Sequence, residues 1–297
     1  IPANFTVKLT GTGSLSCNTI DINRASGEAG GATENLGVIG TLEIDLPLDV
    51  SNEIRTHSGT ALIIPAGKTV NVKGSFVHSA NDSVPKSSVT VNGTLNVNSL
   101  AEGAAGTNTA FINLVANNNA SGTEMTVGAN GKVVAGNFIV RNSYSNTGST
   151  CPVINNGTIE ITAGTGGIEL PNYSGSGTVI LNDGTKFTNN SASTAITVAN
   201  LKIADSATGT VESGNGNIII TKLISGTDSN LAANGTAAAN TVTLSGFENN
   251  LKNLTVSSGT LALGADFEIT GDLTASAGST FAGGTYSAKV GGYFYNI

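Results

Sequence analysis

Val91-Asn92-Gly93-Thr94-Leu95 is the stretch that decides the fold. It shows a five-residue pattern in which an apolar residue, any residue, a glycine, any residue and a second apolar residue follow one another. The pattern has six matches, and the others begin at Val38, Val72, Val134, Ile269 and Val290. Because successive side chains of a strand point to opposite faces, both apolar residues and the glycine share one face. The pattern predicts short strands that bury this face.

The matches recur at a spacing close to 20 residues. Val72 and Val91 are 19 residues apart, and Ile269 and Val290 are 21 residues apart. The 43 residues from Val91 to Val134 fit two such steps. A repeat of this length is typical of solenoids, and glycine suits the corners at which strands bend. We predict an all-β parallel β-helix or solenoid with roughly 20 residues per coil, right-handed as is usual for parallel crossovers.

An antiparallel sandwich is the rival fold. Asn-Gly-Thr occurs at Asn92, Asn156 and Asn234, and Asn-Gly is a strong signal for a hairpin turn. Asn and Gly also suit the turns of a solenoid. The fixed period favours the solenoid, and the hairpin interpretation stays open at this point.

Composition supports an all-β chain and excludes several classes of partner. Of the 297 residues, 11% are charged and 5% are aromatic, and there are 39 glycines and no tryptophan. The hydrophobic share of 39%, placed in alternating runs, is untypical of a disordered chain. The net charge of −7 argues against nucleic acid and anionic membranes as partners. No apolar run reaches the ~18 residues of a membrane helix, so we expect no membrane insertion.

The organisation of the chain changes near residue 60. Residues 1–60 are less regular and richer in charge, and we expect them to form irregular N-terminal coils or a cap. Residues 61–297 are predicted to form the solenoid. The last match ends at Phe294 without a polar cap, although bare strand edges invite aggregation. We therefore expect truncation at the C-terminus, and a downstream portion of the same chain as a partner.

No catalytic residue emerges from the sequence. Ala66-Gly67-Lys68-Thr69 lacks the first glycine of a phosphate-binding loop, and a strand follows it instead of a helix, which indicates a turn. Glu43 and Asp45 alternate with apolar neighbours, as in an ordinary solvent-facing strand. We predict no enzymatic activity and no cofactor.

Histidines and cysteines give weak signals. His57 and His78 are 21 residues apart, about one coil, but no further ligand completes a shell, so no metal site is predicted. Cys17 and Cys151 are 134 residues apart. A disulfide between them would close a long loop, whereas distant coils of a solenoid lie beyond disulfide reach. A disulfide and two independent thiols both remain open.

Tyr293 and Tyr295 are the candidate ligand-binding residues. They flank Phe294, which takes the inward position of the repeat, so both tyrosines are predicted to point outward. Outward tyrosines suit contact with a sugar ring or a protein partner. Burial beneath downstream sequence is the alternative interpretation.

Repeating strand and turn units, rich in Gly, Asn, Thr and Val and poor in charge and Cys, resemble the passenger regions of autotransporters and filamentous-haemagglutinin-like bacterial adhesins. This resemblance implies export, display at the cell surface and attachment to a host surface, matrix protein, glycan or other cells. The alternatives are a β-helix polysaccharide lyase or depolymerase and a passive spacer or surface-layer component.

Overall fold

The computed structural model describes most of the chain as strands and turns. The described residues are 6–22, 40–56, 59–80, 87–97, 111–116, 123–141, 151–162, 167–189, 191, 194–214, 216–235 and 240–297. Within these ranges every regular element is a β-strand. The strands form parallel sheets stacked as a β-solenoid with about 22 residues per turn. The predicted all-β parallel solenoid is confirmed, with a period slightly longer than the predicted one.

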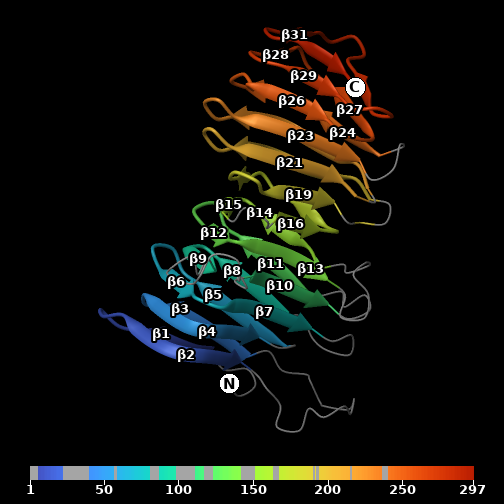
Figure 1. Cartoon of the computed structure of the whole chain (residues 1–297). Helices are drawn as coiled ribbons and strands as arrows, with labels where there is room; N and C mark the ends of the chain where they lie inside the picture. The colour runs from blue at the N-terminus through green and yellow to red at the C-terminus, as the bar shows by residue number, and fades with distance from the viewer. Residues whose placement is uncertain are drawn as a thin grey trace. The chain divides into compact units, whose positions relative to one another are not determined.

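The chain divides into two compact units, Ile1–Gly157 and Thr158–Ile297, which are described separately. In each unit, strands from successive turns pair in parallel and form three ladders. Figure 1 shows strands of successive turns stacked along the coloured chain within each unit. Parallel pairing between successive turns rules out the hairpin sandwich, because hairpin neighbours are antiparallel.

Unit 1 contributes strands to three ladders. The first ladder contains β1 (Thr6–Thr10), β3 (Gly40–Asp45), β5 (Thr60–Ile64), β8 (Ser87–Val91), β11 (Thr123–Val127) and β14 (Val153–Asn155). The second contains the first halves of β2 (Leu15–Ile22) and β4 (Leu48–Thr56), then β6 (Thr69–Val72), β9 (Thr94–Val97) and β12 (Lys132–Ala135). The third contains the second halves of β2 and β4, β7 (Ser75–Ala80), β10 (Phe111–Ala116) and β13 (Asn137–Arg141).

Unit 2 repeats this arrangement. One ladder contains the first halves of β20 (Ile196–Ile203) and β22 (Ile218–Ser225), then β24 (Thr241–Leu244), β27 (Thr260–Leu263) and β30 (Thr280–Ala282). Another contains β15 (Thr158–Ile161), β18 (Thr178–Leu181), the second halves of β20 and β22, and β25 (Phe247–Glu248). The third contains β16 (Gly167–Leu170), β19 (Lys186–Asn189), β21 (Thr208–Ser213), β23 (Asn230–Gly235), β26 (Asn253–Val256), β29 (Leu273–Ala275) and β32 (Phe294–Asn296). The remaining strands are β17 (Tyr173–Ser174) and the pair β28 (Phe267–Ile269) and β31 (Ala288–Val290).

The core consists of columns of aliphatic side chains, one residue from each turn. In unit 1, Leu95 pairs with Val70 on one side and with Val133 on the other, and all three side chains are buried. Burying one such side chain contributes about 1.5 to 3 kcal/mol. Val91 and Leu95, the apolar ends of the deciding stretch, are both buried, which confirms the face predicted for them.

Glycine at the corner of the repeat is explained by close approach of the backbone. A Cβ atom placed on Gly93 would overlap the carbonyl oxygens of Pro65 and Lys68 in the preceding turn. A Cβ atom on Gly74 would overlap the carbonyl oxygen of Asn52. No other residue type lacks this atom, so the pattern keeps glycine where one turn packs on the next.

The repeat pattern gives the wrong face at Val134. This side chain is only half-buried, whereas its neighbour Ala135 and then Phe138 are fully buried. β12 ends at Ala135 and β13 begins at Asn137, so a corner at Gly136 lies inside the pattern. This corner is a single residue and shifts the alternation, whereas the two-residue corner of Asn92 and Gly93 between β8 and β9 leaves both Val91 and Leu95 buried.

Turn length varies more in unit 1 than one period allows. Ser51 donates a hydrogen bond to Cys17, 34 residues earlier, whereas Asn71 and Asp49 of adjacent turns are 22 residues apart. The sequence predicts that residues 1–60 form irregular coils or a cap. In the structure, β1 to β4 lie in this segment and belong to the same ladders as later strands. The boundary near residue 60 stays a prediction.

Candidate functional site

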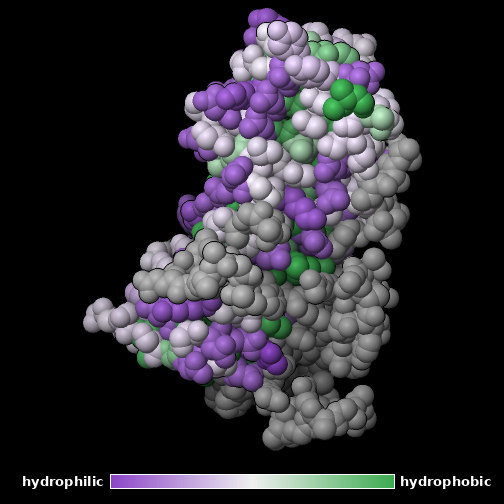
Figure 2. Space-filling view, viewed as in Figure 1, coloured by the Kyte–Doolittle hydropathy of each residue, from purple (hydrophilic) through white to green (hydrophobic). Residues whose placement is uncertain are grey.

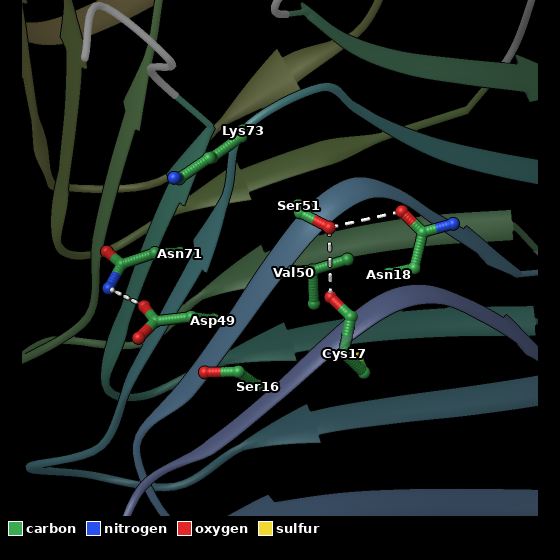
Figure 3. A pocket seen from close by; sticks show the side chains of 8 residues that line it. All are labelled: Ser16, Cys17, Asn18, Asp49, Val50, Ser51, Asn71 and Lys73. Atoms are coloured by element: carbon green, nitrogen blue, oxygen red, sulfur yellow. Dashed lines mark hydrogen bonds between the residues drawn. The ribbon is translucent and has the colours of Figure 1, made fainter. Parts of the chain in front are cut away.

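A groove of about 580 Å³ lies on the outer surface of unit 1 (Figure 3). It runs across β2, β4 and β6, which belong to three successive turns. Six of its eight lining residues have polar side chains, although more of the exposed surface inside the groove is apolar than polar; the lining consists of Ser16, Cys17, Asn18, Asp49, Val50, Ser51, Asn71 and Lys73. Hydroxyl, amide, carboxylate and ammonium groups therefore meet on one solvent-facing surface.

The groove forms where β4 passes from one ladder to the next. Val50 pairs with Val72 of β6, and Glu53 pairs with Ser75 of β7, which leaves Ser51 and an exposed asparagine at the corner. In β2 the register shifts at the same corner, where Asn18 alone stands beside these two residues of β4. An extra residue of this kind bends a strand and redirects side chains. The outward side chains of the corner thus line a hollow.

Hydrogen bonds between turns hold several of these side chains in place. The Nδ2 group of Asn71 donates to Oδ1 of Asp49 over 2.7 Å. The hydroxyl of Ser51 lies 3.1 Å from Oδ1 of Asn18 and 3.3 Å from the carbonyl oxygen of Cys17, as the dashed lines in Figure 3 indicate. Polar groups that are already positioned lose less side-chain entropy when a ligand binds.

The groove carries one negative and one positive group. Asp49 uses one carboxylate oxygen for Asn71, which leaves acceptor capacity on the other oxygen. Lys73 is exposed, and among the described residues no carboxylate lies within ion-pair distance of its ammonium group. A ligand with both hydroxyl donors and an anionic group would complement this arrangement.

The predicted tyrosine pair lies in unit 2. Tyr295 pairs with Thr274 in register, and the rings of Tyr293 and Tyr295 are 5.9 Å apart at an angle of 44°. Tyr293 is 70% exposed and Tyr295 is 43% exposed. Phe294 continues the column of Leu273, as predicted from the repeat, although it is itself exposed. The two tyrosines share one outward face, and their role as ligand-binding residues stays a prediction.

Glu43 and Asp45 behave as the alternation predicts. Their neighbours Leu42 and Ile44 are buried, and both carboxylates pair with Lys8 of the adjacent turn over 2.7 and 2.9 Å. The hydrogen bonds from Lys8 and then from Lys68 lower the pKa of Asp45. This cluster joins one turn to the next on the surface of unit 1.

Of the two histidines, the structure describes only His78. His78 is fully buried between Thr56 and Ser87, whose hydroxyls contact its Nδ1 and Nε2 atoms. His57 lies outside the described residues. Within the described ranges, no cluster of three or more His, Cys, Asp or Glu side chains is arranged to hold a metal ion.

Cys17 and Cys151 are not joined by a disulfide. Cys17 belongs to β2, whereas Cys151 precedes β14 in another ladder. Burial raises the pKa of the Cys17 thiol, and burial followed by the charge of Glu124 raises the pKa of Cys151 to about 12. The sequence left a disulfide and two independent thiols open, and the structure contains two independent thiols.

Unit 2 has a second polar groove, with a volume of about 420 Å³. Its lining includes Lys202, Asp205, Glu248 and Asn249. Asn249 uses its side-chain amide to donate to the carbonyl oxygen of Ser225, and Asp205 accepts from the backbone of Thr227. These groups connect successive turns, so we assign them a structural role.

Sequence reasoning did not identify Asp49, Asn71 and Lys73 as site residues. Asp49 and Asn71 are 22 residues apart, which is about one turn. This spacing between two polar residues is the only feature of the sequence that indicates their contact. The unequal turn lengths of unit 1 hide which residues lie side by side.

Comparison with known proteins does not place the chain in a family: no family model, no curated protein and no solved structure matches it. Among the described residues no helix is long and apolar enough to cross a membrane.

Proposed function

We propose that this chain is a secreted or surface-displayed bacterial structural and adhesive stalk that mediates attachment to a host surface, matrix protein, glycan or other cells. It acts by binding and not by catalysis. One observation carries this proposal: outward positions hold polar side chains that hydrogen bonds fix from one turn to the next.

This organisation recurs along the outer faces of both units. Asn71 bonds to Asp49 in unit 1, and Asn253 bonds to Asn230 in unit 2 over 2.8 Å. Hydrophilic and near-neutral residues cover most of the described surface that is visible in Figure 2. A surface of fixed donors and acceptors favours attachment, because many weak polar contacts to one partner add up through repetition.

A binding array tests the proposal directly. The purified chain is applied to arrayed glycans and immobilised matrix proteins, next to the chain unfolded by heat as a control. We expect saturable binding by the folded chain alone. If the folded chain binds no glycan, matrix protein or cell type, the adhesive function is wrong, and the passive spacer becomes the better interpretation.

A polysaccharide lyase or depolymerase is the second candidate, and one observation favours it. Asp49 and Lys73 place a carboxylate and a basic group in one groove, which sites that cleave acidic polysaccharides require. Incubation of the chain with a panel of polysaccharides separates the two functions. New reducing or unsaturated sugar ends would replace the adhesive proposal with catalysis, whereas binding without new ends supports attachment.

A further inference from the structure

We propose that the groove over β2, β4 and β6 binds a saccharide that carries a carboxylate, such as a uronic acid residue. This inference rests on the proposed adhesive function and names the ligand class of one site. Lys73 pairs with the carboxylate of the sugar, and Asp49 and Asn71 bind its hydroxyl groups.

The size and the shape of the groove fit a short saccharide. Small-molecule sites measure about 300 to 1,000 Å³, and this groove has a volume of about 580 Å³. It lies open on the surface of unit 1 and not in the core, so a ligand enters without any rearrangement of the strands. Six of its eight lining residues carry polar side chains that can form hydrogen bonds with the hydroxyl groups of a ligand.

The Asp49 and Asn71 pair matches the hydroxyl groups of a sugar. Because Asn71 donates one of its two amide hydrogens to Asp49, its second hydrogen and its carbonyl oxygen remain for a ligand. Asp49 only accepts while it is ionised. A sugar hydroxyl donates and accepts at once, so adjacent hydroxyls bind the carboxylate and the amide together.

Lys73 selects for the carboxylate. Its ammonium group has no described carboxylate partner, and a carboxylate on the ligand gives it a charge-assisted hydrogen bond. A ligand that is only an anion, such as inorganic phosphate, lacks the carbon-bound hydroxyls that Asp49 and Asn71 would bind. The combination of one cation, one carboxylate and one amide therefore favours an acidic sugar.

The ladder geometry positions these groups before a ligand arrives. Asp49 and Asn71 are partners in register across β4 and β6, and their 2.7 Å hydrogen bond restricts both side chains. Ser51 is likewise fixed by Asn18. Sites on paired strands hold their geometry better than sites on loops.

Titration calorimetry with a uronic acid oligosaccharide tests the inference. The matched probes are the same oligosaccharide with its carboxyl groups reduced to alcohols, and inorganic phosphate. We expect the folded chain to bind the acidic oligosaccharide more tightly than the neutral one, and not to bind phosphate. Equal affinity for the acidic and neutral forms would overturn the role of Lys73. Binding of phosphate, without binding of either oligosaccharide, would overturn the assignment of a saccharide as the ligand.

Two variants test the named residues. Lys73→Gln is expected to weaken binding of the acidic oligosaccharide about fivefold and to leave the neutral one unchanged. Asp49→Asn is expected to weaken both about tenfold. Lys252→Gln and Asp228→Asn, an exposed pair in unit 2 whose charged atoms are 3.6 Å apart, are the matched controls. Circular dichroism verifies that each variant is folded.

The outcomes separate this inference from the adhesive function. If the chain binds arrayed glycans but Lys73→Gln and Asp49→Asn bind acidic oligosaccharide like the original chain, the groove is not the site and the adhesive function stands. If the original chain binds nothing on the array, both proposals fail.

Discussion

At the scale of single residues, short acidic and amide side chains connect one turn to the next. Oδ1 of Asp183 accepts a hydrogen bond from the backbone of Thr208 over 2.8 Å, and Asp205 accepts in the same way from Thr227 over 2.9 Å. Backbone N–H groups at a corner have no ladder partner, and an intramolecular hydrogen bond made by such a group contributes about 0.5 to 1.5 kcal/mol to stability. These side chains therefore stabilise the corners of unit 2.

Asp205→Ala is expected to lower the free energy of unfolding by about 1 kcal/mol, because the amide of Thr227 loses its acceptor. Denaturant unfolding measures the change. Lys289→Ala, which removes an exposed side chain paired with Glu268 in the same unit, is the control and is expected to change stability less. A larger loss in the control would argue against a role for the corner hydrogen bond.

Acid is expected to weaken the structure through Asp266. The backbone N–H and then the hydroxyl of Ser287 donate to this carboxylate and lower its pKa from the usual value of 3.8. The unfolded chain therefore takes up its proton at a higher pH than the folded chain. The stability is present above pH 3.8 and is lost as the pH falls through the lower folded pKa.

Asp266→Asn keeps the acceptor oxygen and removes the ionisation. We expect this variant to be less stable than the original chain at pH 5 and to approach its stability at pH 3, when both are unfolded by denaturant. An equal difference at the two pH values would contradict the proposed linkage.

The two thiols are expected to differ in reactivity. The thiolate is the reactive form, and burial raises the pKa of Cys151 to about 12, so little thiolate exists there at pH 8. Cys17 is only partly buried. Iodoacetamide is expected to modify Cys17 in the folded chain, and to modify Cys151 only after unfolding, as peptide mass spectrometry measures. Equal rates in the folded chain would show that Cys151 is accessible.

At the scale of elements, the corners decide how closely the turns pack. The corner at Gly93 packs against the carbonyl oxygens of Pro65 and Lys68 in the preceding turn. Gly93→Ala is expected to destabilise the chain by about 1 to 3 kcal/mol, because the added methyl group must push these two backbone segments apart. Thermal unfolding measures the loss.

Gly13 provides the matched control for this substitution. A Cβ atom at Gly13 would have no heavy atom within 4 Å. Gly13→Ala is expected to change stability by less than about 0.5 kcal/mol. Similar losses for both variants would indicate that glycine acts through chain flexibility and not through close approach.

The bend in β4 is the second feature at this scale. One strand serves two ladders, pairing with β6 through its first half and with β7 through its second half. Ser51, at the corner between these halves, lines the groove in unit 1 together with Asn18 of β2. The same irregularity that interrupts the alternation thus creates the candidate site.

At the scale of the whole molecule, stability is carried by contacts between neighbouring turns. Phe76 of β7 is fully buried and pairs with Ile54 of β4 and Ile112 of β10. Each turn of a solenoid contacts only the turns beside it, so damage to one turn spreads mainly to its neighbours.

Phe76→Ala is expected to cost about 3 to 5 kcal/mol and to speed amide hydrogen exchange most in β4 and β10. Strands later in the chain, such as β26, are expected to keep their protection. Phe76→Leu, whose side chain fills more of the space than alanine does, serves as the milder variant and is expected to lose less stability. Uniform loss of protection along the chain would contradict stabilisation by neighbouring turns.

Much of the fold followed from local sequence. Alternation placed Val91, Leu95, Leu42 and Ile44 correctly in the core, because the side-chain period of a strand is fixed at two residues. The prediction failed at Val134, where a corner at Gly136 shifts the alternation and nothing in the five-residue pattern marks the shift.

The candidate site was only partly accessible to the same reasoning. Tyr293 and Tyr295 are two residues apart, so alternation alone placed them on one face, and their rings lie together. The groove combines Asn18, Ser51 and Lys73 from three turns of different length. Their neighbourhood depends on the register, which the spacing of repeats specifies only approximately.

The sequence by itself determined the all-β class and the inward face of most strands and favoured the parallel solenoid, since all three depend on periods of two and about 20 residues. Only the tertiary structure decided the register between turns, and with it the contact of Asp49 with Asn71 and the placement of Lys73 in the groove. The physical reason is that alternation acts along one strand, whereas register is set by the packing of each turn on the next.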